Sequence, residues 1–263
     1  MFGIVKAYFI FLDTMKNTKV ALVTWWCSWI GKQIVSQLVR SGISVVVNYV
    51  HEQACAEDVV DDIVARGGEA LSVQADVSDS KSVQKMFVRI EKQFGRLDFL
   101  VNNAGIDVMQ DLEGFDDMMW EKIVAINLTG KFLCTKYAIP LLKKSSHPKI
   151  INIASRLGTK AMPQASAYCC AESAIIMLTK VSALELSKYH ISVNTISPGL
   201  TRTALSEWVY KDPKIWEKTK NITPMWRIGE PQDIANMVEF LLSDKSDYID
   251  GENINVSGGN ILV

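Results

Sequence analysis

The fold of this chain is indicated by residues 19–47, which read KVALVTWWCSWIGKQIVSQLVRSGISVVV. Val20 to Val23 form a short apolar run, which is typical of a strand buried on both faces of a sheet. Ile30 to Val39 carry apolar residues at helical spacing, and Ser41-Gly42 ends that pattern. Ile43 to Val47 form a second β-branched run. The stretch therefore predicts a strand, a helix and a parallel strand.

The same alternation continues along the rest of the chain. Further strands are expected at 70–73, 97–101, 150–153, 191–196 and 254–256, and further helices at 52–65, 78–94, 115–142, 165–187, 205–219 and 231–242. Ser78 is a plausible N-cap, a break is expected near Ile126-Asn127, and 205–219 could be a mobile lid. We predict an α/β fold: a single-domain, Rossmann-like, doubly wound parallel sheet flanked by helices, over residues 16–263.

The composition excludes several classes of function. The chain has 263 residues, of which 48% are hydrophobic and 22% charged, as in ordinary globular proteins. Its net charge of −1 provides no electrostatic basis for binding nucleic acid or an anionic membrane. Five irregularly spaced cysteines are no disulfide framework, and none of the three histidines lies near a cysteine pair. We therefore expect a cytoplasmic protein without a metal site.

The first segment departs from this ordinary composition. Residues 1–12 read MFGIVKAYFIFL, but their unbroken apolar stretch, Ala7–Leu12, is far shorter than the ~20 residues that span a bilayer. No signal-peptide cleavage pattern follows it. We interpret residues 1–15 as an apolar N-terminal extension, upstream of a natural start at Met15. A surface or oligomer contact and a membrane anchor are the alternatives.

Several motifs follow the expected strands in a fixed order. They are Asp76-Val77, Asn102-Asn103-Ala104-Gly105, Asn127, Ser155 with Tyr168 thirteen residues later, and Pro198-Gly199 with Thr203. Together they resemble the short-chain dehydrogenase/reductase family, and most of all its 3-oxoacyl-thioester reductases and glucose-1-dehydrogenase-like members. The resemblance runs from about Lys16 to the C-terminus.

The resemblance implies hydride transfer between a nicotinamide and a carbonyl or alcohol carbon of a small substrate. Tyr168 would exchange a proton with the substrate oxygen, Ser155 would hold that oxygen, and Asn127 would hold a water in a proton path. Glu172 takes the position of the family's lysine. Relatives commonly form tetramers, so a homotetramer packed through helices 128–143 and 165–187 is expected.

The resemblance also implies a set of cofactor contacts: Thr24, Ser28, Ile30, Gly31, Asn48, Asp76, Val77, Asn103, Ala104, Gly105, Pro198, Gly199 and Thr203. Asp76 and Val77 would touch the adenine, the loop 102–105 would line the ribose, and Pro198, Gly199 and Thr203 would shape the nicotinamide pocket. The end of the second strand, Val47–His51, has no acidic residue to select NAD by its ribose hydroxyl. This favours NADP over NAD, although no arginine is present there to hold a 2′-phosphate.

The glycine-rich loop departs from the family pattern. Relatives have T-G-x-x-x-G-I-G, whereas this chain has T-W-W-C-S-W-I-G over residues 24–31. Trp25 and Trp29 stand at the first two glycine positions, which allow a tight turn and the approach of a pyrophosphate to the helix. If the first position needs positive φ, a side chain there costs roughly 1–2 kcal/mol. We expect Trp25, Trp26 and Trp29 to obstruct the cofactor.

The catalytic helix also departs from the pattern. Residues i and i+4 share a helix face, so Glu172 faces Tyr168 where relatives place a lysine. A carboxylate raises the tyrosine pKa, whereas an ammonium lowers it. Trp226, where relatives have a small or polar residue, is interpreted as surface variation.

Two functions of different classes remain open. The first is an NAD(P)-dependent oxidoreductase whose turnover is impaired by the loop tryptophans and Glu172. The second is a non-catalytic scaffold or ligand-binding pseudoenzyme with the same fold. The tryptophans could also form an aromatic patch for a new ligand or partner, or the loop could bind the cofactor in a rearranged form.

Overall fold

The computed structural model describes residues 18–25 and 27–262. Within them lies a seven-stranded parallel sheet in the order β3-β2-β1-β4-β5-β6-β7. Its strands are β1 (Val20–Val23), β2 (Ser44–Tyr49), β3 (Ala70–Gln74), β4 (Phe99–Asn102), β5 (Lys149–Ile153), β6 (Ser192–Pro198) and β7 (Asn253–Val256). The order reverses between β1 and β4, so ligands are expected at the carboxyl ends of these two strands. The predicted doubly wound α/β fold is confirmed.

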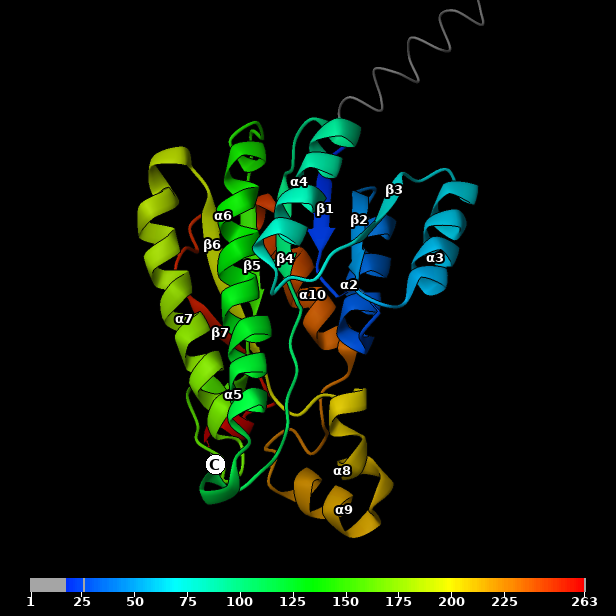
Figure 1. Ribbon diagram of the computed structural model, residues 1–263. Coiled ribbons are helices and arrows are strands. Elements are labelled where there is room, and N and C mark those ends of the chain that lie inside the picture. Colours follow the sequence, from blue (N-terminus) through cyan, green and yellow to red (C-terminus); the bar gives the residue numbers. More distant parts are fainter. Residues whose placement is uncertain (1–17, 26, 263) are drawn as a thin grey trace, which may run out of the picture.

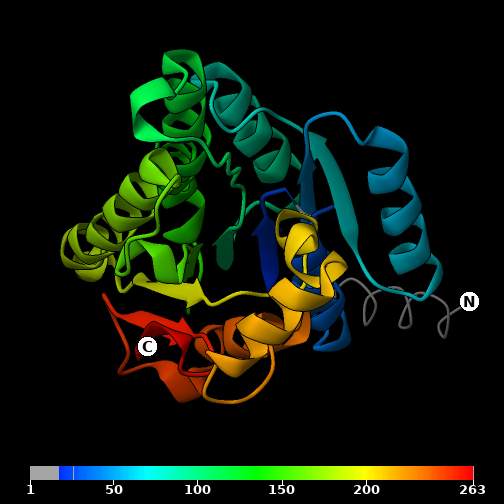
Figure 2. The ribbon, with the colours of Figure 1, turned by 90° about the horizontal axis from the view of Figure 1, so that it is seen from below.

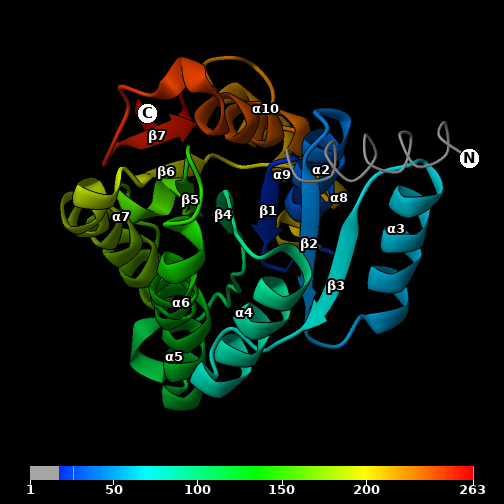
Figure 3. The ribbon, with the colours of Figure 1, turned by 90° about the horizontal axis from the view of Figure 1, so that it is seen from above.

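Helices cover both faces of the sheet (Figures 1 and 3). One face carries α2 (Trp29–Arg40), α3 (Gln53–Ala65) and α10 (Pro231–Leu242), and the other carries α4 (Ser80–Phe94), α6 (Gly130–Leu142) and α7 (Ser166–Leu186). Each face has its own apolar core. The fully buried runs of β1, β2, β4 and β5 separate the two cores, as the continuous apolar stretches predict.

Some predicted boundaries change. The helix expected at 78–94 begins at Ser80, because the Asp79 carboxylate accepts from the amides of Lys81 and Ser82; Asp79, and not Ser78, is therefore its N-cap. The helix expected at 205–219 is two helices, α8 (Glu207–Lys211) and α9 (Pro213–Asn221), with Asp212 capping the second.

The break expected near residue 126 is a π-helical turn, η2 (Val124–Thr129), between α5 (Asp117–Ile123) and α6. Such turns often occur at functional sites, because the extra residue changes the direction of a side chain. Here it turns the fully buried Asn127 toward α7, as the hydrogen bonds described below show.

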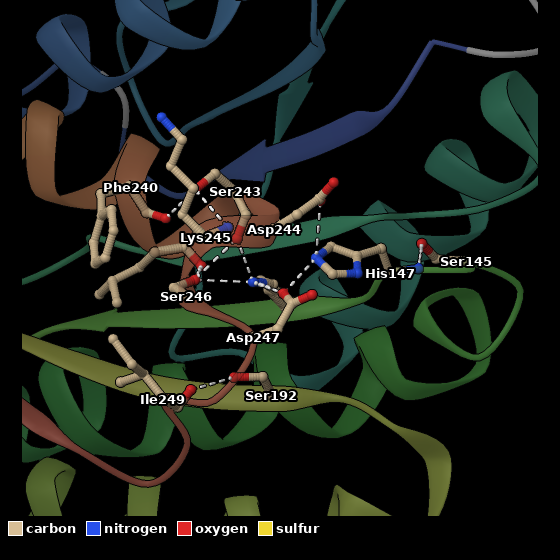
Figure 4. A network of polar contacts seen from close by, with 12 residues as sticks. Ser145, His147, Ser192, Phe240, Ser243, Asp244, Lys245, Ser246, Asp247 and Ile249 are labelled. Carbon is tan, nitrogen blue, oxygen red and sulfur yellow. Dashed lines mark hydrogen bonds and ion pairs between the residues drawn. The ribbon is translucent and has the colours of Figure 1, made fainter.

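The amino end of the sheet carries a network of polar contacts that includes His147, Ser246 and Asp247 (Figure 4). Lys149 Nζ donates to the Ser243 carbonyl at 2.6 Å, to Ser246 Oγ at 2.9 Å and to Asp247 Oδ1 at 2.9 Å. His147 Nε2 lies 3.0 Å from the same Asp247 oxygen. The network joins β5 to the turn after α10, and it stands at the opposite end of the strands from the cavity described next.

By length and composition, the segment Ser166–Tyr189, which contains α7, could cross a membrane, but core helices of soluble proteins often have the same composition. In this fold α7 packs against β6 and η2. Its outer side exposes Met177, Val181 and Leu184. The predicted extension at 1–15 lies outside the described residues.

Candidate active site

A cavity of about 550 Å³ opens at the carboxyl ends of the strands. Figure 2 looks onto this end, with the yellow and orange helices α8 and α9 in front of it. The cavity is bordered by the loop after β1, the loop after β4, the end of β5, α7 and the segment after β6. It therefore lies at the reversal of strand order, where the fold class places its ligands.

Ser155 and Tyr168 meet in this cavity. Ser155 follows β5, and its hydroxyl accepts from the Leu157 amide at 3.1 Å, which fixes its position. Tyr168 is on the first turns of α7. Burial raises the pKa of Tyr168 well above its usual 10.0, the Glu172 carboxylate raises it further, and the Ser155 hydroxyl opposes the shift. The phenol is therefore held in its protonated form.

Glu172 lies one turn after Tyr168 and is 2% exposed. Its Oε1 accepts from Asn127 Nδ2 at 2.9 Å. Asn127 is itself fixed, because its Oδ1 accepts from the Ile106 amide at 2.9 Å and its Nδ2 donates to the Ile106 carbonyl at 3.0 Å. The other carboxylate oxygen, Oε2, is buried and has no hydrogen-bond partner among the described residues.

Burial raises the pKa of the Glu172 carboxyl to about 7. The ammonium of Lys131 and the hydrogen bond from Asn127 oppose this shift, and the Asp107 carboxylate adds to it. At neutral pH the carboxyl is therefore divided between its charged and neutral forms.

Four charged residues that line the cavity were not predicted as site residues: Glu52, Asp107, Lys131 and Arg156. Lys131, on α6, is 2% exposed, and its Nζ donates to the Ala104 carbonyl at 2.7 Å. Burial lowers its pKa, and Glu172 opposes that shift. Asp107 follows the Asn-Asn-Ala-Gly loop, and its Oδ1 is buried with no hydrogen-bond partner in the described part of the chain. Burial raises the pKa of this carboxyl.

A signal for Lys131 was present in the sequence. It lies four residues after Asn127, so the two share a helix face, and the run Lys131-Phe132-Leu133-Cys134 is otherwise apolar. A lysine at such a position is almost never fully buried unless it is paired. Lys131, on α6, and Glu172, on α7, both line the cavity, but among the described residues no ion pair within 4.0 Å joins them.

The loop after β1 contains the tryptophans. Trp25 has a φ of +48°, the left-handed conformation that glycine adopts without strain. Its indole lines the cavity and also packs against the apolar core beneath α4 and α6. Trp29, the first residue of α2, is 50% exposed and lines the cavity as well. Trp26 lies outside the described residues.

Asn103 holds this loop in place. Its Nδ2 donates to the carbonyls of Thr24 and Trp25 at 3.2 and 3.0 Å, and to Ser28 Oγ at 3.0 Å. The Thr24 hydroxyl accepts from the amides of Asn103 and Ala104, and Ser28 caps α2 by accepting from Gly31 N at 3.0 Å. The loop is thus firmly tied to β4 despite its tryptophans.

The predicted site residues divide into two groups. Those that line the cavity are Ser28, Ile30, Asn103, Ala104, Gly105, Ser155, Tyr168, Glu172, Pro198, Gly199 and Thr203. Those that do not line it are Thr24, Gly31, Asn48, Asp76, Val77 and Asn127. Gly199 also has a packing reason, because a Cβ there would lie 2.6 Å from Ser257 Cα.

Three residues of the second group have clear structural partners. Asn48 is buried, donates to the carbonyls of Val73 and Ala75, and accepts from the Trp25 amide at 3.3 Å. Asp76 is exposed and accepts from the Ser78 amide at 2.9 Å. Val77 is buried against Gly130, where a Cβ would meet Val77 Cγ2 at 2.8 Å. Their cofactor contacts stay predictions.

Known proteins resemble this chain over almost all its length. Residues 28–260 match the family model described as enoyl-(acyl carrier protein) reductase. The chain is 38% identical over 245 residues to the 3-oxoacyl-[acyl-carrier-protein] reductase FabG of Staphylococcus aureus, covering 93% of this chain and 99% of that protein. It is 36% identical over 252 residues to the 3-oxoacyl-[acyl-carrier-protein] reductase of Synechocystis sp., covering 95% and 99%.

Solved structures agree with these relatives. A gluconate 5-dehydrogenase from Burkholderia cenocepacia, in complex with NADP and tartrate, superposes with a TM-score of 0.89 at 28% identity, covering 96% of this chain and 99% of that one. The Pseudomonas aeruginosa RhlG/NADP active-site complex has a TM-score of 0.87 at 31% identity, covering 94% and 98%.

Proposed function

The chain belongs to the short-chain dehydrogenase/reductase family of NAD(P)-dependent oxidoreductases, and from this we propose that it reduces a small carbonyl compound, or oxidises the matching alcohol, with Tyr168 as acid or base. One observation carries the proposal. The Ser155 hydroxyl and the Tyr168 phenol, from separate elements, converge in one cavity at the switch point of the sheet.

The residues of the chain divide the chemistry between them. A bound dinucleotide supplies or accepts the hydride. Ser155 donates a hydrogen bond to the substrate oxygen, and Tyr168 gives its proton to that oxygen as negative charge develops on it. The raised pKa of Tyr168 makes it a weaker acid, and each unit corresponds to about 1.4 kcal/mol. We therefore propose a turnover well below that of a relative with an ammonium beside the tyrosine.

The residues at the reacting end of the cavity fit the nicotinamide ribose. The unpartnered Glu172 Oε2 and Asp107 Oδ1 are acceptors that sugar hydroxyls can satisfy. The pyrophosphate end is less open, because the indoles of Trp25 and Trp29 line it. We propose that the dinucleotide binds weakly. NADP is preferred over NAD in this proposal because the end of β2 and the two residues after it carry no acidic side chain; Glu52, the next residue, lines the cavity and acts against this preference.

A non-catalytic protein of the same fold is the second candidate. Trp25 and Trp29 favour it, since they stand where a pyrophosphate would approach α2. In that case the cavity would serve a different ligand or none, and the fold would act as a scaffold.

The assembly and location belong to the same proposal. The exposed apolar side chains of α7 (Met177, Val181 and Leu184), with Phe132 on α6, suit packing against copies of this chain in a homotetramer. We propose a cytoplasmic protein that works without nucleic acid or membrane, on a small carbonyl or alcohol substrate.

The test combines binding and turnover. Calorimetric titration with NADPH and NADH is performed on the unaltered chain and on a variant with Trp25→Gly, Trp26→Gly, Trp29→Gly, Glu172→Lys and Lys131→Met, in which the new lysine does not meet a second buried ammonium group. NADPH-dependent reduction of small ketones and 3-oxoacyl thioesters is then measured, with Tyr168→Phe as the matched control. We expect that control to lose at least about 100-fold in rate while retaining dinucleotide binding. Failure of the glycine and lysine variant to bind or to turn over any substrate would overturn the proposal.

A further inference from the structure

The carboxyl group of Glu172 is placed to store a proton for Tyr168. It lies one turn along the same helix, it is buried, and its orientation is fixed by Asn127 at one oxygen only. We propose that, in the reduction of the proposed function, Glu172 returns a proton to Tyr168 after each turnover, and that Lys131 stabilises the carboxylate left behind.

The two oxygens of Glu172 have different tasks in this proposal. Oε1 accepts from Asn127 Nδ2, so it is the acceptor end of the group. Oε2 has no partner in the described structure, and an unpartnered buried oxygen costs about 1–3 kcal/mol unless something occupies the site. A protonated Oε2 can donate toward the cavity, through one intervening hydroxyl or water, to Tyr168.

The charged groups around Glu172 come from each neighbouring element. Tyr168 lies on its own helix, Asn127 on η2, Lys131 on α6 and Asp107 on the loop after β4. Lys131 favours the ionised form and Asp107 opposes it. The ammonium is anchored to the Ala104 carbonyl at 2.7 Å, so it remains near the carboxyl through the reaction. It is a positioning residue, since it acts through Glu172.

The direction of proton transfer follows from the two acidities. The Glu172 carboxyl has a pKa of about 7, whereas that of Tyr168 is raised well above its usual 10.0. A proton therefore passes from the neutral carboxyl to a tyrosinate, because the carboxyl is the stronger acid of the two. A buried glutamate is thus a suitable donor here, even though its negative charge is unfavourable beside a tyrosinate.

The step balances in atoms and charge. Hydride arrives at the carbonyl carbon from the reduced nicotinamide, and the O–H bond of Tyr168 breaks as the substrate oxygen takes the proton. The O–H bond of the neutral Glu172 carboxyl then breaks, and the proton reaches Tyr168 through the intervening group. Glu172 is left as a carboxylate facing the Lys131 ammonium, and it regains a proton from solvent before the next turnover.

The first arm of the test needs no dinucleotide. Infrared difference spectra between pH 5 and pH 9 record the carboxylic acid band of the chain. The component of this band that is missing in the Glu172→Gln variant is assigned to Glu172. We expect this group to titrate near pH 7. Lys131→Met should move its midpoint upward by at least one unit, while Lys136→Met, an exposed lysine on the same helix, should leave it unchanged. A midpoint below pH 5.5, or one that Lys131→Met does not move, would overturn the proposal.

The second arm measures the pH profile of reduction. The turnover rate of the unaltered chain should fall about tenfold per pH unit above pH 7. The Glu172→Gln variant should be slower than the unaltered chain below pH 7, and its rate should not change with pH above pH 7. The Glu172→Asp variant should recover part of the pH dependence. Equal profiles for the unaltered chain and Glu172→Gln would overturn the proton-donor role. If no variant binds dinucleotide, the proposed function fails and the proton-donor role fails with it, even where the infrared arm has confirmed the Lys131–Glu172 coupling.

Discussion

Asn127 Nδ2 lies 2.9 Å from Glu172 Oε1, and this contact joins the π-helical turn η2 to α7. The amide nitrogen is a donor, so it suits a carboxyl oxygen and would repel an ammonium. Asn127 Oδ1 is already occupied by the Ile106 amide. The surroundings of position 172 are thus adapted to glutamate, and this has consequences for stability as well as for activity.

The first prediction concerns stability and pH. The pKa of Glu172 is about 7 in the folded chain, against 4.5 when exposed, so between these values the folded state binds the extra proton. The contribution of Glu172 to the free energy of unfolding is therefore most favourable below pH 4.5. This contribution falls by about 3 kcal/mol at most as pH rises toward 7. Urea unfolding at pH 5 and pH 8 measures this.

The matched control is Glu172→Gln, which keeps the acceptor for Asn127. Other carboxyls titrate equally in both proteins, so the difference between their unfolding free energies isolates Glu172. We expect the free energy of unfolding of the variant to increase relative to that of the unaltered chain as pH rises. A difference that stays constant from pH 5 to pH 8 would contradict the raised pKa.

The second prediction is that lysine at position 172 is tolerated only when Lys131 is removed. Glu172→Lys alone puts two buried ammonium groups near each other and leaves the Asn127 donor facing one of them, so we expect a loss of about 3 kcal/mol or more. Lys131→Met alone should cost less, because Glu172 can become neutral. The double variant should recover at least about 1 kcal/mol of the loss.

A double-mutant cycle by urea unfolding at pH 7 gives this coupling directly. Lys136→Met replaces Lys131→Met in a parallel cycle as the exposed control on α6. Strict additivity in the Lys131 cycle, or equal coupling in both cycles, would show that Lys131 and position 172 do not interact.

The fold was predictable because its evidence is local. Each buried strand is a short apolar run, and helices such as α2 and α4 have one apolar stripe, so the alternation along the sequence predicts a parallel sheet. The boundaries were less certain. Asp79 and Ser78 both can cap a helix, and only the contacts with Lys81 and Ser82 decide between them. Asp212 likewise splits a segment that read as one helix.

The site was predictable only in part. The family resemblance predicted Ser155, Tyr168 and Asn127, and the structure brings Ser155 and Tyr168 together in the cavity. Lys131 and Asp107 were missed, since their importance arises from burial beside Glu172, which depends on how α6 and α7 pack. Nothing in the sequence indicated that the side-chain amide of Asn48 donates to the carbonyls of Val73, on β3, and of Ala75, just after β3.

The third prediction concerns the opposite end of the sheet. Lys149→Met removes hydrogen bonds to Ser243, Ser246 and Asp247, of which Ser246 is buried. We expect a loss of about 2–4 kcal/mol in unfolding free energy and no change in the pH dependence of turnover. Lys245→Met, an exposed lysine of the same turn, is the control and should be neutral. A neutral Lys149→Met would mean that the network contributes nothing net.

The fourth prediction separates two effects of the tryptophans, backbone strain and obstruction. Trp25 and Trp226 both have positive φ, +48° and +55°, where a side chain costs about 1–2 kcal/mol. Trp226 is 69% exposed and does not line the cavity, so Trp226→Gly should only relieve strain and stabilise by about 1 kcal/mol. Trp25→Gly also loses the packing of its indole, so its stability should change by less than about 1 kcal/mol.

Dinucleotide binding then distinguishes the two positions. Because Trp25 lines the cavity at the start of α2, Trp25→Gly combined with Trp29→Gly should tighten NADPH binding by at least about tenfold in calorimetric titration, whereas Trp226→Gly should leave the Kd unchanged. Equal affinity in all three proteins would mean that the indoles do not stand in the path of the pyrophosphate. Weaker binding in the double variant would mean instead that they contribute to a rearranged site, since an indole that merely obstructs cannot improve affinity by its presence.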